Sequence, residues 1–229
     1  MQLYKIRSGN ISVLKNKGYL ICVGISLGNK WFTPENILSL IQWSLKNSLG
    51  NVVVCPADDI HAINIQVRRR VSTVKAQEIA QKMSKELMDK VKQMVEAKLS
   101  FEEGSRVVYA NWSDLQTEDY RDKVRFMYDL YENNLDFKRE IVSLVEGHTS
   151  QEERNYRPED LDKFATYLLE EFPEVAGIVP IKGVFCDAYV YPRDGEMTQF
   201  VEEIQKGKKF PEIKEFIIGS KPKTFLEVR

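Results

Sequence analysis

A serine stands where the sequence predicts that a buried strand gives way to a helix. The apolar run Leu20–Val23 has strand length, and Gly24-Ile25-Ser26-Leu27-Gly28 follows it. A helix start is predicted soon afterwards, because Thr33 is a good N-cap residue and Pro34 suits the first helical position. Ligands of open α/β sheets bind at the carboxyl ends of the strands, where N–H groups at a helix start stabilise negative charge. Ser26 is therefore placed where a nucleophile could act.

The two glycines around Ser26 also fit the G-x-S-x-G pattern of a serine hydrolase. A hydrolase needs an acid and then a histidine downstream, and of the two histidines, His61 and His148, only His148 has this order. Only about one predicted strand precedes Ser26, whereas the hydrolase serine normally follows several. A serine hydrolase or esterase using Ser26 and His148 is thus one alternative. A tight turn whose glycines serve steric needs alone is another.

The elements that must position this serine are those of an α/β protein. The 229 residues, 43% of them hydrophobic, suit a single domain over residues 1–229. Strand-like runs are found at residues 19–23, 52–55, 106–110, 177–181, 184–191 and 215–219. Helical periodicity is found at residues 37–49, 67–98, 114–133, 135–146 and 158–171, and a long polar loop is predicted at 147–157. The alternation predicts a mostly parallel sheet covered by helices on both faces.

The cysteines and the lengths of the apolar runs indicate in which cellular compartment the protein is expected. Cys22, Cys55 and Cys186 lie in or beside apolar runs at no metal-ligand spacing, so we expect small buried residues in a reducing cytoplasm and no metal. The N-terminus lacks a signal-peptide core, and no run approaches membrane-spanning length. These features predict a cytoplasmic protein without a membrane partner.

Positive charge is concentrated in one segment. Residues 67–98 contain nine basic and four acidic side chains, a net +5 in a chain whose total is −1. Such segregation is typical of a surface that binds a polyanion such as RNA. The candidate residues are Arg68, Arg69, Arg70, Lys75, Lys82 and Lys85. The alternative is a solvated face opposite an apolar stripe. A non-enzymatic RNA-binding protein is therefore a third hypothesis for the whole chain.

A tyrosine and a carboxylate share a face of one predicted helix. Tyr167 and Glu171 are four residues apart, near a predicted helix end at Pro173. Near a sheet edge, such a pair could hold a substrate ammonium group. An exposed acidic helix end is the alternative.

Taken together, these pieces resemble the cyclodipeptide synthases from about Tyr19 to Phe200. The residues that carry the resemblance are Gly24–Phe32 with Asn36 and Leu40-Ile41-Gln42-Trp43, Asp119-Tyr120-Arg121, Tyr167 with Glu171-Phe172-Pro173, and Tyr191-Pro192. The resemblance implies a Rossmann-like α/β fold similar to the catalytic domain of class I aminoacyl-tRNA synthetases. It also implies a monomer that joins the aminoacyl groups of two aminoacyl-tRNAs into a cyclic dipeptide, a diketopiperazine, without ATP, metal or cofactor.

The resemblance also implies roles for single residues. Ser26 is the nucleophile that accepts the first aminoacyl group. Tyr167 and Glu171 hold its α-amino group, and Glu171 also transfers protons. Tyr120 and Tyr191 complete the polar surroundings of the serine, and Asn29 stabilises the turn. One group of the family has asparagine, tyrosine and histidine at three marker positions, and the other has tyrosine and proline at the last two. With Asn29, Tyr191 and Pro192, this chain is placed nearer the proline group.

Pocket residues follow from the same resemblance. The first pocket should contain Gly24, Cys22, Val53 or Val54, Glu174, Val175 and His148. A buried carboxylate needs a partner, so Glu174 predicts a polar or cationic first amino acid, with histidine favoured. The alternative is that Glu174 faces solvent. Tyr189 and Arg193 suggest a polar or acidic second amino acid.

Overall fold

The computed structural model describes residues 1–149, 155–192, 195–219 and 221–229. A six-stranded sheet forms its centre, in the order β1-β8-β7-β2-β3-β4. The strands are β1 (Leu3–Arg7), β2 (Ile21–Ile25), β3 (Val52–Pro56), β4 (Val107–Tyr109), β7 (Ala188–Tyr191) and β8 (Thr224–Val228). All neighbours pair in parallel except β1, which runs antiparallel to β8 at the edge.

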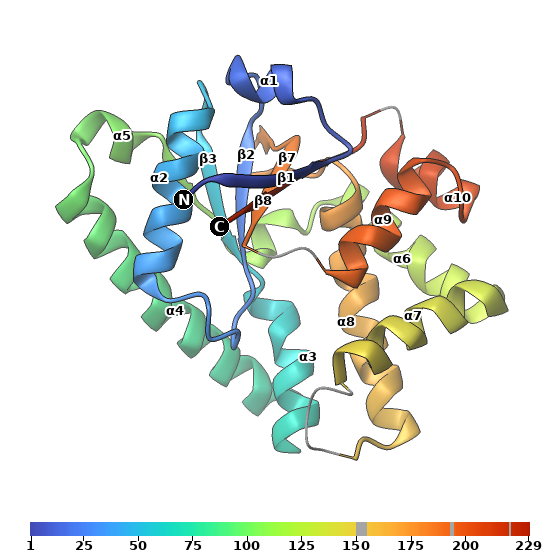
Figure 1. The fold of residues 1–229 in the computed structure, drawn as a ribbon. Coiled ribbons are helices and arrows are strands. Elements are labelled where there is room, and N and C mark those ends of the chain that lie inside the picture. The colour runs from blue at the N-terminus through green and yellow to red at the C-terminus, as the bar shows by residue number, and fades with distance from the viewer. Residues whose placement is uncertain (150–154, 193–194, 220) are drawn as a thin grey trace.

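One face of the sheet is covered by α2 (Pro34–Asn47) and α4 (Thr73–Lys98) (Figure 1). Their apolar stripes pack on β-branched side chains of the central strands, including Val23, Val54 and Val190. On α4, Val91 and Val95 of the expected apolar stripe are buried, while Ile79, Met83 and Leu87 are half-buried. The helices and the strands form here because apolar residues at helical spacing and at strand spacing are buried in the same core.

The other face is covered by α3 (Asp58–Arg69), α6 (Glu118–Asn133), α8 (Pro158–Ala176) and α9 (Glu196–Gln205). Helix α7 (Leu135–Thr149) packs on α6 and α8 and is set away from the sheet (Figure 1). Aromatic side chains fill the space between these helices, among them Phe137, Phe172 and Phe200. The predicted fold class, a mostly parallel sheet with helices on both faces, is confirmed.

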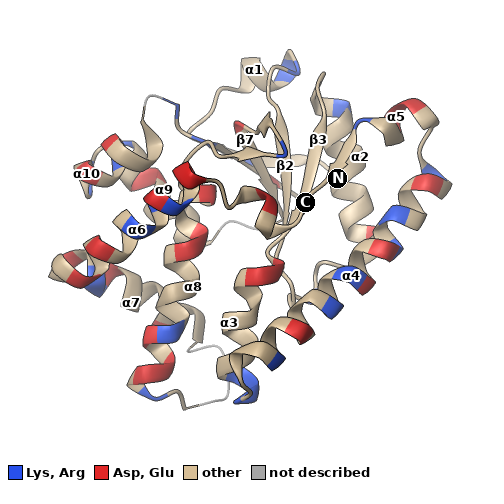
Figure 2. Ribbon diagram, turned by 180° about the vertical axis from the view of Figure 1, so that it is seen from behind, with Lys and Arg blue, Asp and Glu red and all other residues tan. Residues whose placement is uncertain are grey.

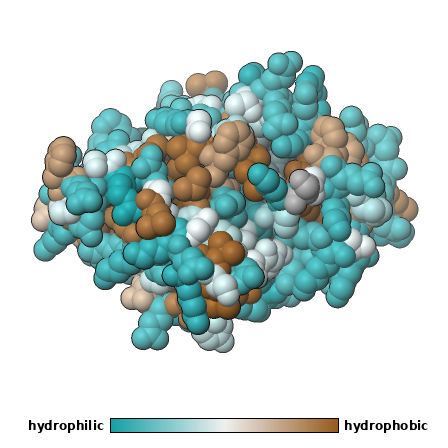
Figure 3. Space-filling view, turned by 90° about the horizontal axis from the view of Figure 1, so that it is seen from above, coloured by the Kyte–Doolittle hydropathy of each residue, from teal (hydrophilic) through white to brown (hydrophobic). Residues whose placement is uncertain are grey.

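Short elements complete the fold. They are α1 (Ile11–Lys15), α5 (Phe101–Ser105), a 3₁₀ turn (Trp112–Leu115), the hairpin β5 (Pro180–Ile181) and β6 (Val184–Phe185), α10 (Pro211–Ile213) and a π-helical turn (Lys214–Ile218). Figure 3 looks onto the end that carries α1, where hydrophobic patches interrupt a mostly hydrophilic surface. Within the described residues, no helix combines the length and apolar character that crossing a membrane requires.

Three expectations about elements are wrong. Residues 214–218 form the π-helical turn instead of a strand. The predicted strand 184–191 divides into β6 and β7, because the Asp187 side chain turns aside to accept the N–H of Leu20 at 2.8 Å. The predicted helix 67–98 breaks at Arg70, whose backbone is left-handed at φ 52°. Part of the predicted loop, residues 150–154, lies outside the described residues, and residues 147–149 are helical.

Helix α8 continues past Pro173, where the sequence predicts its end. A proline removes one N–H from the helical ladder, yet the Gly177 N–H still reaches the Pro173 oxygen at 3.1 Å. Burial of Phe172, Pro173 and Val175 holds this last turn against the core. Glu174 therefore stays on α8, three residues beyond Glu171 and directed into the protein.

Candidate active site

Ser26 is the first residue after β2 and is partly buried. Its main-chain oxygen accepts the N–H of Asn29 at 3.3 Å, and Gly28 adopts φ 81°, which a residue with a side chain rarely does. The predicted cap of α2 is confirmed, because Thr33 Oγ1 accepts the N–H of Asn36 at 3.3 Å. A tight turn therefore holds the serine at the carboxyl edge of the sheet.

Tyr191 lies over this turn from the end of β7. Burial, aided by the charge of Glu171, raises the pKa of Tyr191 to about 12, while its hydrogen bonds with Ser26 and Asn29 oppose that rise. Its ring lies 5.4 Å from the ring of Phe32, centroid to centroid. The phenol is therefore neutral at physiological pH and is positioned beside the serine hydroxyl.

Asn29 has two contacts that fix the turn. Besides meeting Tyr191, its side-chain oxygen accepts the N–H of Trp31 at 3.0 Å. An asparagine that bonds the backbone two residues later is a common turn device. The arrangement agrees with the turn-stabilising role that the sequence suggested.

Tyr167 and Glu171 face each other on α8. The Tyr167 hydroxyl lies 3.1 Å from Oε1 of Glu171. Burial, together with the charge of Glu174, raises the pKa of Glu171 to about 7, and the hydrogen bond from Tyr167 acts in the opposite direction. A carboxylate with this pKa can both bind an ammonium group and exchange a proton near neutral pH.

Tyr120 has a different place from the one expected. It is buried, its hydroxyl donates to the main-chain oxygen of Glu170 at 2.6 Å, and it accepts the indole N–H of Trp112 at 3.2 Å. Both interactions are structural. Tyr120 thus supports the backbone of α8 behind Glu171 instead of presenting its hydroxyl to a substrate.

Four of the residues predicted for the first pocket share one feature, which is that they are buried. Cys22, Val53, Val175 and Glu174 are all buried on the side of the sheet covered by α8. The alternative in which Glu174 faces solvent is therefore wrong. Its partner is Lys223, whose Nζ lies 2.8 Å from Oε1 of Glu174. Sequence reasoning missed Lys223, because no motif distinguishes a lysine so far along the chain.

Tyr189 lies next to two of these predicted residues, Cys22 and Gly24. It pairs across the sheet with Cys22, and a Cβ on residue 24 would stand 1.6 Å from the Tyr189 hydroxyl oxygen. Gly24 is thus required by the close approach of this ring, which also stacks on Tyr191 with a centroid distance of 6.3 Å. The assignment of Tyr189 to the second amino acid stays a prediction, and the ring lies beside Cys22 and Gly24, which were predicted for the first pocket. Arg193, predicted with it, lies outside the described residues.

The histidine at the serine turn is His61. His148 is exposed in the last turn of α7, unlike Cys22, Val53, Glu174 and Val175, with which it was predicted and which are buried. His61 is buried on α3, and a Cβ on Gly28 would lie 3.2 Å from its Nε2. Burial, with the charges of Arg68 and Arg69, lowers the pKa of His61 to about 4. Its place could not be read from the sequence, because α3 and the turn meet only in the fold.

The predicted basic surface divides into two parts. On α4, Lys75, Lys82 and Lys85 are exposed but pair with acids of the same helix, at 2.9, 3.8 and 2.6 Å. Figure 2 shows this alternation of basic and acidic residues along α4. At the end of α3, Arg68 and Arg70 line a hollow of about 290 Å³ with Val67, Asn155 and Tyr156. The concentration of positive charge is therefore at residues 68–70.

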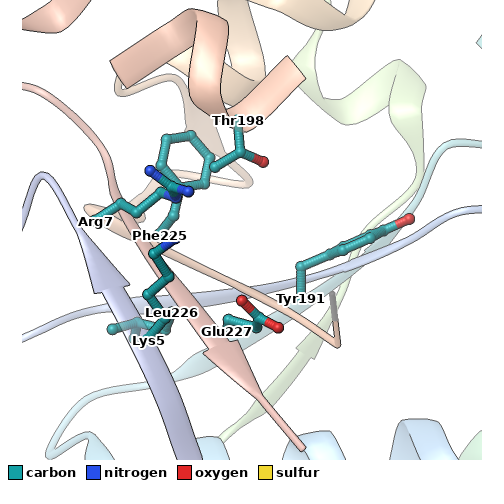
Figure 4. A pocket seen from close by; sticks show the side chains of 7 residues that line it. All are labelled: Lys5, Arg7, Tyr191, Thr198, Phe225, Leu226 and Glu227. Atoms are coloured by element: carbon teal, nitrogen blue, oxygen red, sulfur yellow. The ribbon is translucent and has the colours of Figure 1, made fainter. Parts of the chain in front are cut away.

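A smaller hollow of about 20 Å³ lies beside Tyr191, between β1, β8 and α9. Figure 4 shows its lining, with the Tyr191 hydroxyl directed away from Glu227. In the described part of the chain, no group of three or more His, Cys, Asp or Glu side chains is arranged to hold a metal ion.

The combination of a serine turn, an overlying tyrosine and a Tyr–Glu pair agrees with the comparison to known families. The sequence model described as "Cyclodipeptide synthase" matches residues 9–209. The chain belongs to this family. It is therefore an enzyme, a cyclodipeptide synthase, on a sheet related to that of class I tRNA synthetases. No curated protein sequence is similar enough to count as a match.

Solved structures share the fold. A cyclodipeptide synthase from Bacillus thermoamylovorans has a TM-score of 0.74 at 20% identity, covering 94% of this chain and 90% of that one. A protein from Mycobacterium tuberculosis, described as showing that these enzymes are related to type I tRNA synthetases, has 0.70 at 18%, covering 94% and 87%. The synthase from Candidatus Glomeribacter gigasporarum bound to Phe-tRNAPhe has 0.62 at 19%, covering 96% and 93%.

Proposed function

We propose that this cyclodipeptide synthase uses Ser26 to join the aminoacyl groups of two aminoacyl-tRNAs. The observation that carries the proposal is the position of Ser26 beneath Tyr191 on the turn after β2, with the Tyr167–Glu171 pair on α8. A solved relative is described as bound to Phe-tRNAPhe, which supports aminoacyl-tRNA as the substrate class. The aminoacyl ester is already activated, so no ATP and no cofactor are needed.

The first step is a transesterification. Ser26 Oγ attacks the ester carbonyl carbon, the bond to the ribose oxygen of tRNA breaks, and the serine proton passes to that leaving oxygen. The Glu171 carboxylate and the Tyr167 hydroxyl, 3.1 Å apart, hold the α-ammonium group of the bound residue. Tyr191 orients the serine hydroxyl.

Two aminolysis steps then complete the product. The amine of the second aminoacyl-tRNA attacks the Ser26 ester, so the peptide bond forms, the bond to Ser26 Oγ breaks, and the dipeptide is esterified to the second tRNA. We propose that Ser26 Oγ then attacks this tRNA ester, its proton passes to the ribose oxygen that leaves, and a dipeptidyl-enzyme results. The free amine then attacks its own ester, which closes the ring and releases Ser26. This last step is intramolecular, and favourable proximity can lower such a barrier by about 7–11 kcal/mol.

The finer assignments are parts of the same proposal. The buried Glu174 favours a polar first amino acid, with histidine favoured, and we propose an acidic or otherwise polar second one. Arg68, Arg69 and Arg70 are the proposed tRNA contacts, because three successive basic residues end α3 and two of them, Arg68 and Arg70, line the hollow of about 290 Å³, although Arg70 also lies 3.6 Å from Asp160. Asn29 with Pro192 leaves the chain nearer the tyrosine–proline subgroup, and we propose a cytoplasmic monomer.

Mass spectrometry of the medium and cells of a bacterium expressing the chain tests the proposal. A cyclic dipeptide that is present with the intact chain and absent with Ser26→Ala is expected. Tyr131→Phe is a matched control, because its hydroxyl contacts Asp162 away from the serine. Production unchanged in Ser26→Ala would refute the nucleophile. Ester hydrolysis without tRNA that is lost in His148→Ala would instead favour the hydrolase alternative.

A further inference from the structure

A buried histidine lies against the serine turn, and no step of the mechanism above uses it. His61 is on α3 and is 5% exposed. A Cβ on Gly28 would lie 3.1 Å from Cε1 and 3.2 Å from Nε2 of His61, so this edge of the ring faces the backbone of the glycine. Gly28 is two residues beyond Ser26 and adopts φ 81°. The imidazole is therefore a neighbour of the turn that carries the nucleophile.

The ring of His61 has hydrogen-bonding capacity that the described residues do not use. None of them bonds either ring nitrogen, and burial with the charges of Arg68 and Arg69 lowers the pKa of His61 to about 4. The imidazole is therefore neutral at physiological pH, with one donor nitrogen and one acceptor nitrogen. Polar groups this deeply buried are nearly always hydrogen-bonded, so the ring calls for a ligand or a bound water.

His61 begins a row of polar side chains along α3. Asn64 and Arg68 follow it by three and seven residues, and these spacings place all three side chains on one face of the helix. Asn64 and Arg68 are partly buried, whereas Arg69 and Arg70 beyond them are exposed. At the rise of an α-helix the row extends about 10 Å along the axis. It ends at the hollow of about 290 Å³ that Arg68 and Arg70 line.

The far end of this row approaches α8. The guanidinium carbon of Arg68 lies 5.5 Å from the ring centroid of Phe164. Burial raises the pKa of Tyr167, and the charge of Arg68 opposes that rise. The row thus has the serine turn at one end and the helix of the Tyr167–Glu171 pair at the other. A substrate that extends from the arginines to Ser26 would pass along this face of α3.

The chemistry of an aminoacyl-tRNA indicates which of its groups reaches His61. The reacting ester is formed by one oxygen of the terminal ribose, and the adjacent ribose carbon carries a hydroxyl group. Attack by Ser26 brings this ribose to the serine turn, while the phosphates extend toward the arginines that we propose as tRNA contacts. The ribose hydroxyl is neutral, so a neutral imidazole can bond it without the cost of burying a charge.

We propose that His61 binds the terminal ribose of the first aminoacyl-tRNA: the hydroxyl next to the ester donates a hydrogen bond to Nε2 of His61, and this contact positions the leaving oxygen at Ser26. The inference rests on the proposed function, and it deepens it by assigning a residue to the leaving group. His61 forms no covalent bond, and the serine proton still passes to the ribose oxygen that leaves.

The experiment measures acylation of Ser26 in the purified full-length chain by intact-protein mass spectrometry at single turnover. The probe is whichever of the twenty aminoacyl-tRNAs acylates Ser26 fastest. Its terminal adenosine is either intact or replaced by 2′-deoxyadenosine, with the ester on the 3′ oxygen. We expect the intact chain to react with the deoxy substrate more slowly by about tenfold or more, because the lost hydrogen bond leaves a buried nitrogen without a partner.

Variants of His61 separate this contact from support of the turn. His61→Phe keeps a planar ring and removes both nitrogens. We expect it to slow the ribose substrate by about tenfold and to reduce the ratio of ribose to deoxyribose rates by the same factor. A ring that only supported the turn would slow both substrates equally and leave this ratio unchanged. His61→Gln places an amide near Nε2 and should keep most of the ratio.

The matched control is Gln66→Leu. It removes a polar side chain that contacts Thr73 at 3.1 Å from another face of α3, so its rates and their ratio should equal those of the intact chain. Circular dichroism and Tm establish that each variant is folded. If His61→Phe does not fold, His61→Leu takes its place and the same ratio decides.

The outcomes distinguish this inference from the proposed function. Equal rates of the intact chain with both substrates, or a ratio that is unchanged in the variant without ring nitrogens, would overturn the inference while the proposed function stands. Failure of all twenty aminoacyl-tRNAs to acylate Ser26 would overturn both.

Discussion

The Tyr167 hydroxyl lies 3.1 Å from Oε1 of Glu171, one helical turn away on α8, and this carboxyl has a pKa of about 7. The ionised form is the one that binds the α-ammonium group. We therefore expect kcat/KM for Ser26 acylation to fall as the pH drops below 7. Glu171→Gln should remove this inflection and lower the rate about 100-fold or more. A pH–rate profile of the variant that still bends near pH 7 would assign the titration to another group.

The free energy of unfolding should also depend on pH through the ionisation of Glu171. Its folded-state pKa is raised from 4.5 to about 7, so the folded chain binds more protons than the unfolded chain between these values. Folding stability from this group therefore falls as the pH rises from 4.5 to 7. Relative to the intact chain, Glu171→Gln should gain stability over that window and keep the gain above it. Denaturant unfolding at pH 4.5, 6 and 8 measures the difference, and a gain confined to low pH contradicts it.

Tyr191 contacts both Ser26 and Asn29 through its hydroxyl. Tyr191→Phe removes these hydrogen bonds and keeps the ring that packs on Phe32 at 5.4 Å. Loss of one neutral hydrogen bond is worth about 1 kcal/mol, so we expect acylation to slow by about fivefold with little change in Tm. Tyr131→Phe serves as the control. Equal rates for both variants would exclude an orienting role of the Tyr191 hydroxyl.

The Glu174–Lys223 pair predicts a pattern of stability. Removing one member of a buried pair strands the other charge and typically costs about 3–5 kcal/mol, whereas removing both is often neutral. Lys223→Met should therefore destabilise strongly, and Glu174→Met/Lys223→Met should recover most of the loss. Urea unfolding of the intact chain, Lys223→Met, Glu174→Met and the double variant gives the four free energies of unfolding. A double variant as unstable as the sum of the single ones would mean that the pair is not coupled.

Binding of tRNA should depend on the end of α3 more than on α4. Lys82 and Lys85 pair with Glu86 and Asp89 on their own helix, whereas residues 68–70 are three successive arginines, one of which, Arg70, lies 3.6 Å from Asp160. Arg69→Ala/Arg70→Ala should weaken binding and reduce the slope of log affinity against log salt by up to about 2, because each phosphate contact contributes about 0.9. Filter binding at several salt concentrations compares it with Lys82→Ala/Lys85→Ala. Equal slopes for the two variants would contradict the assignment.

Local sequence patterns were sufficient to predict several of the helices and strands. The cap Thr33-Pro34, the stripe of α4 and the β-branched runs of β2 and β3 predicted their elements, because each requires only neighbouring residues. The strand–serine–helix turn was recognisable for the same reason, since glycine, proline and capping residues act within a few positions. These local signals also carried the resemblance to the family. Strands β1 and β8, whose pairing joins the two chain ends, were not foreseen.

Tertiary structure alone decided what surrounds the serine. Glu174 remains on α8 because packing of its last turn outweighs the helix-breaking tendency of Pro173. Lys223 meets it from a segment 49 residues later in the chain, and His61, not His148, reaches the serine turn. Tyr120 bonds a backbone oxygen instead of facing the site. The arrangement of whole helices and strands determines such partners, because a buried charge pairs with a group that can come from a distant segment of the chain. The sequence by itself therefore determined the serine turn and the layered fold, whereas the partners of each polar group depend on long-range packing.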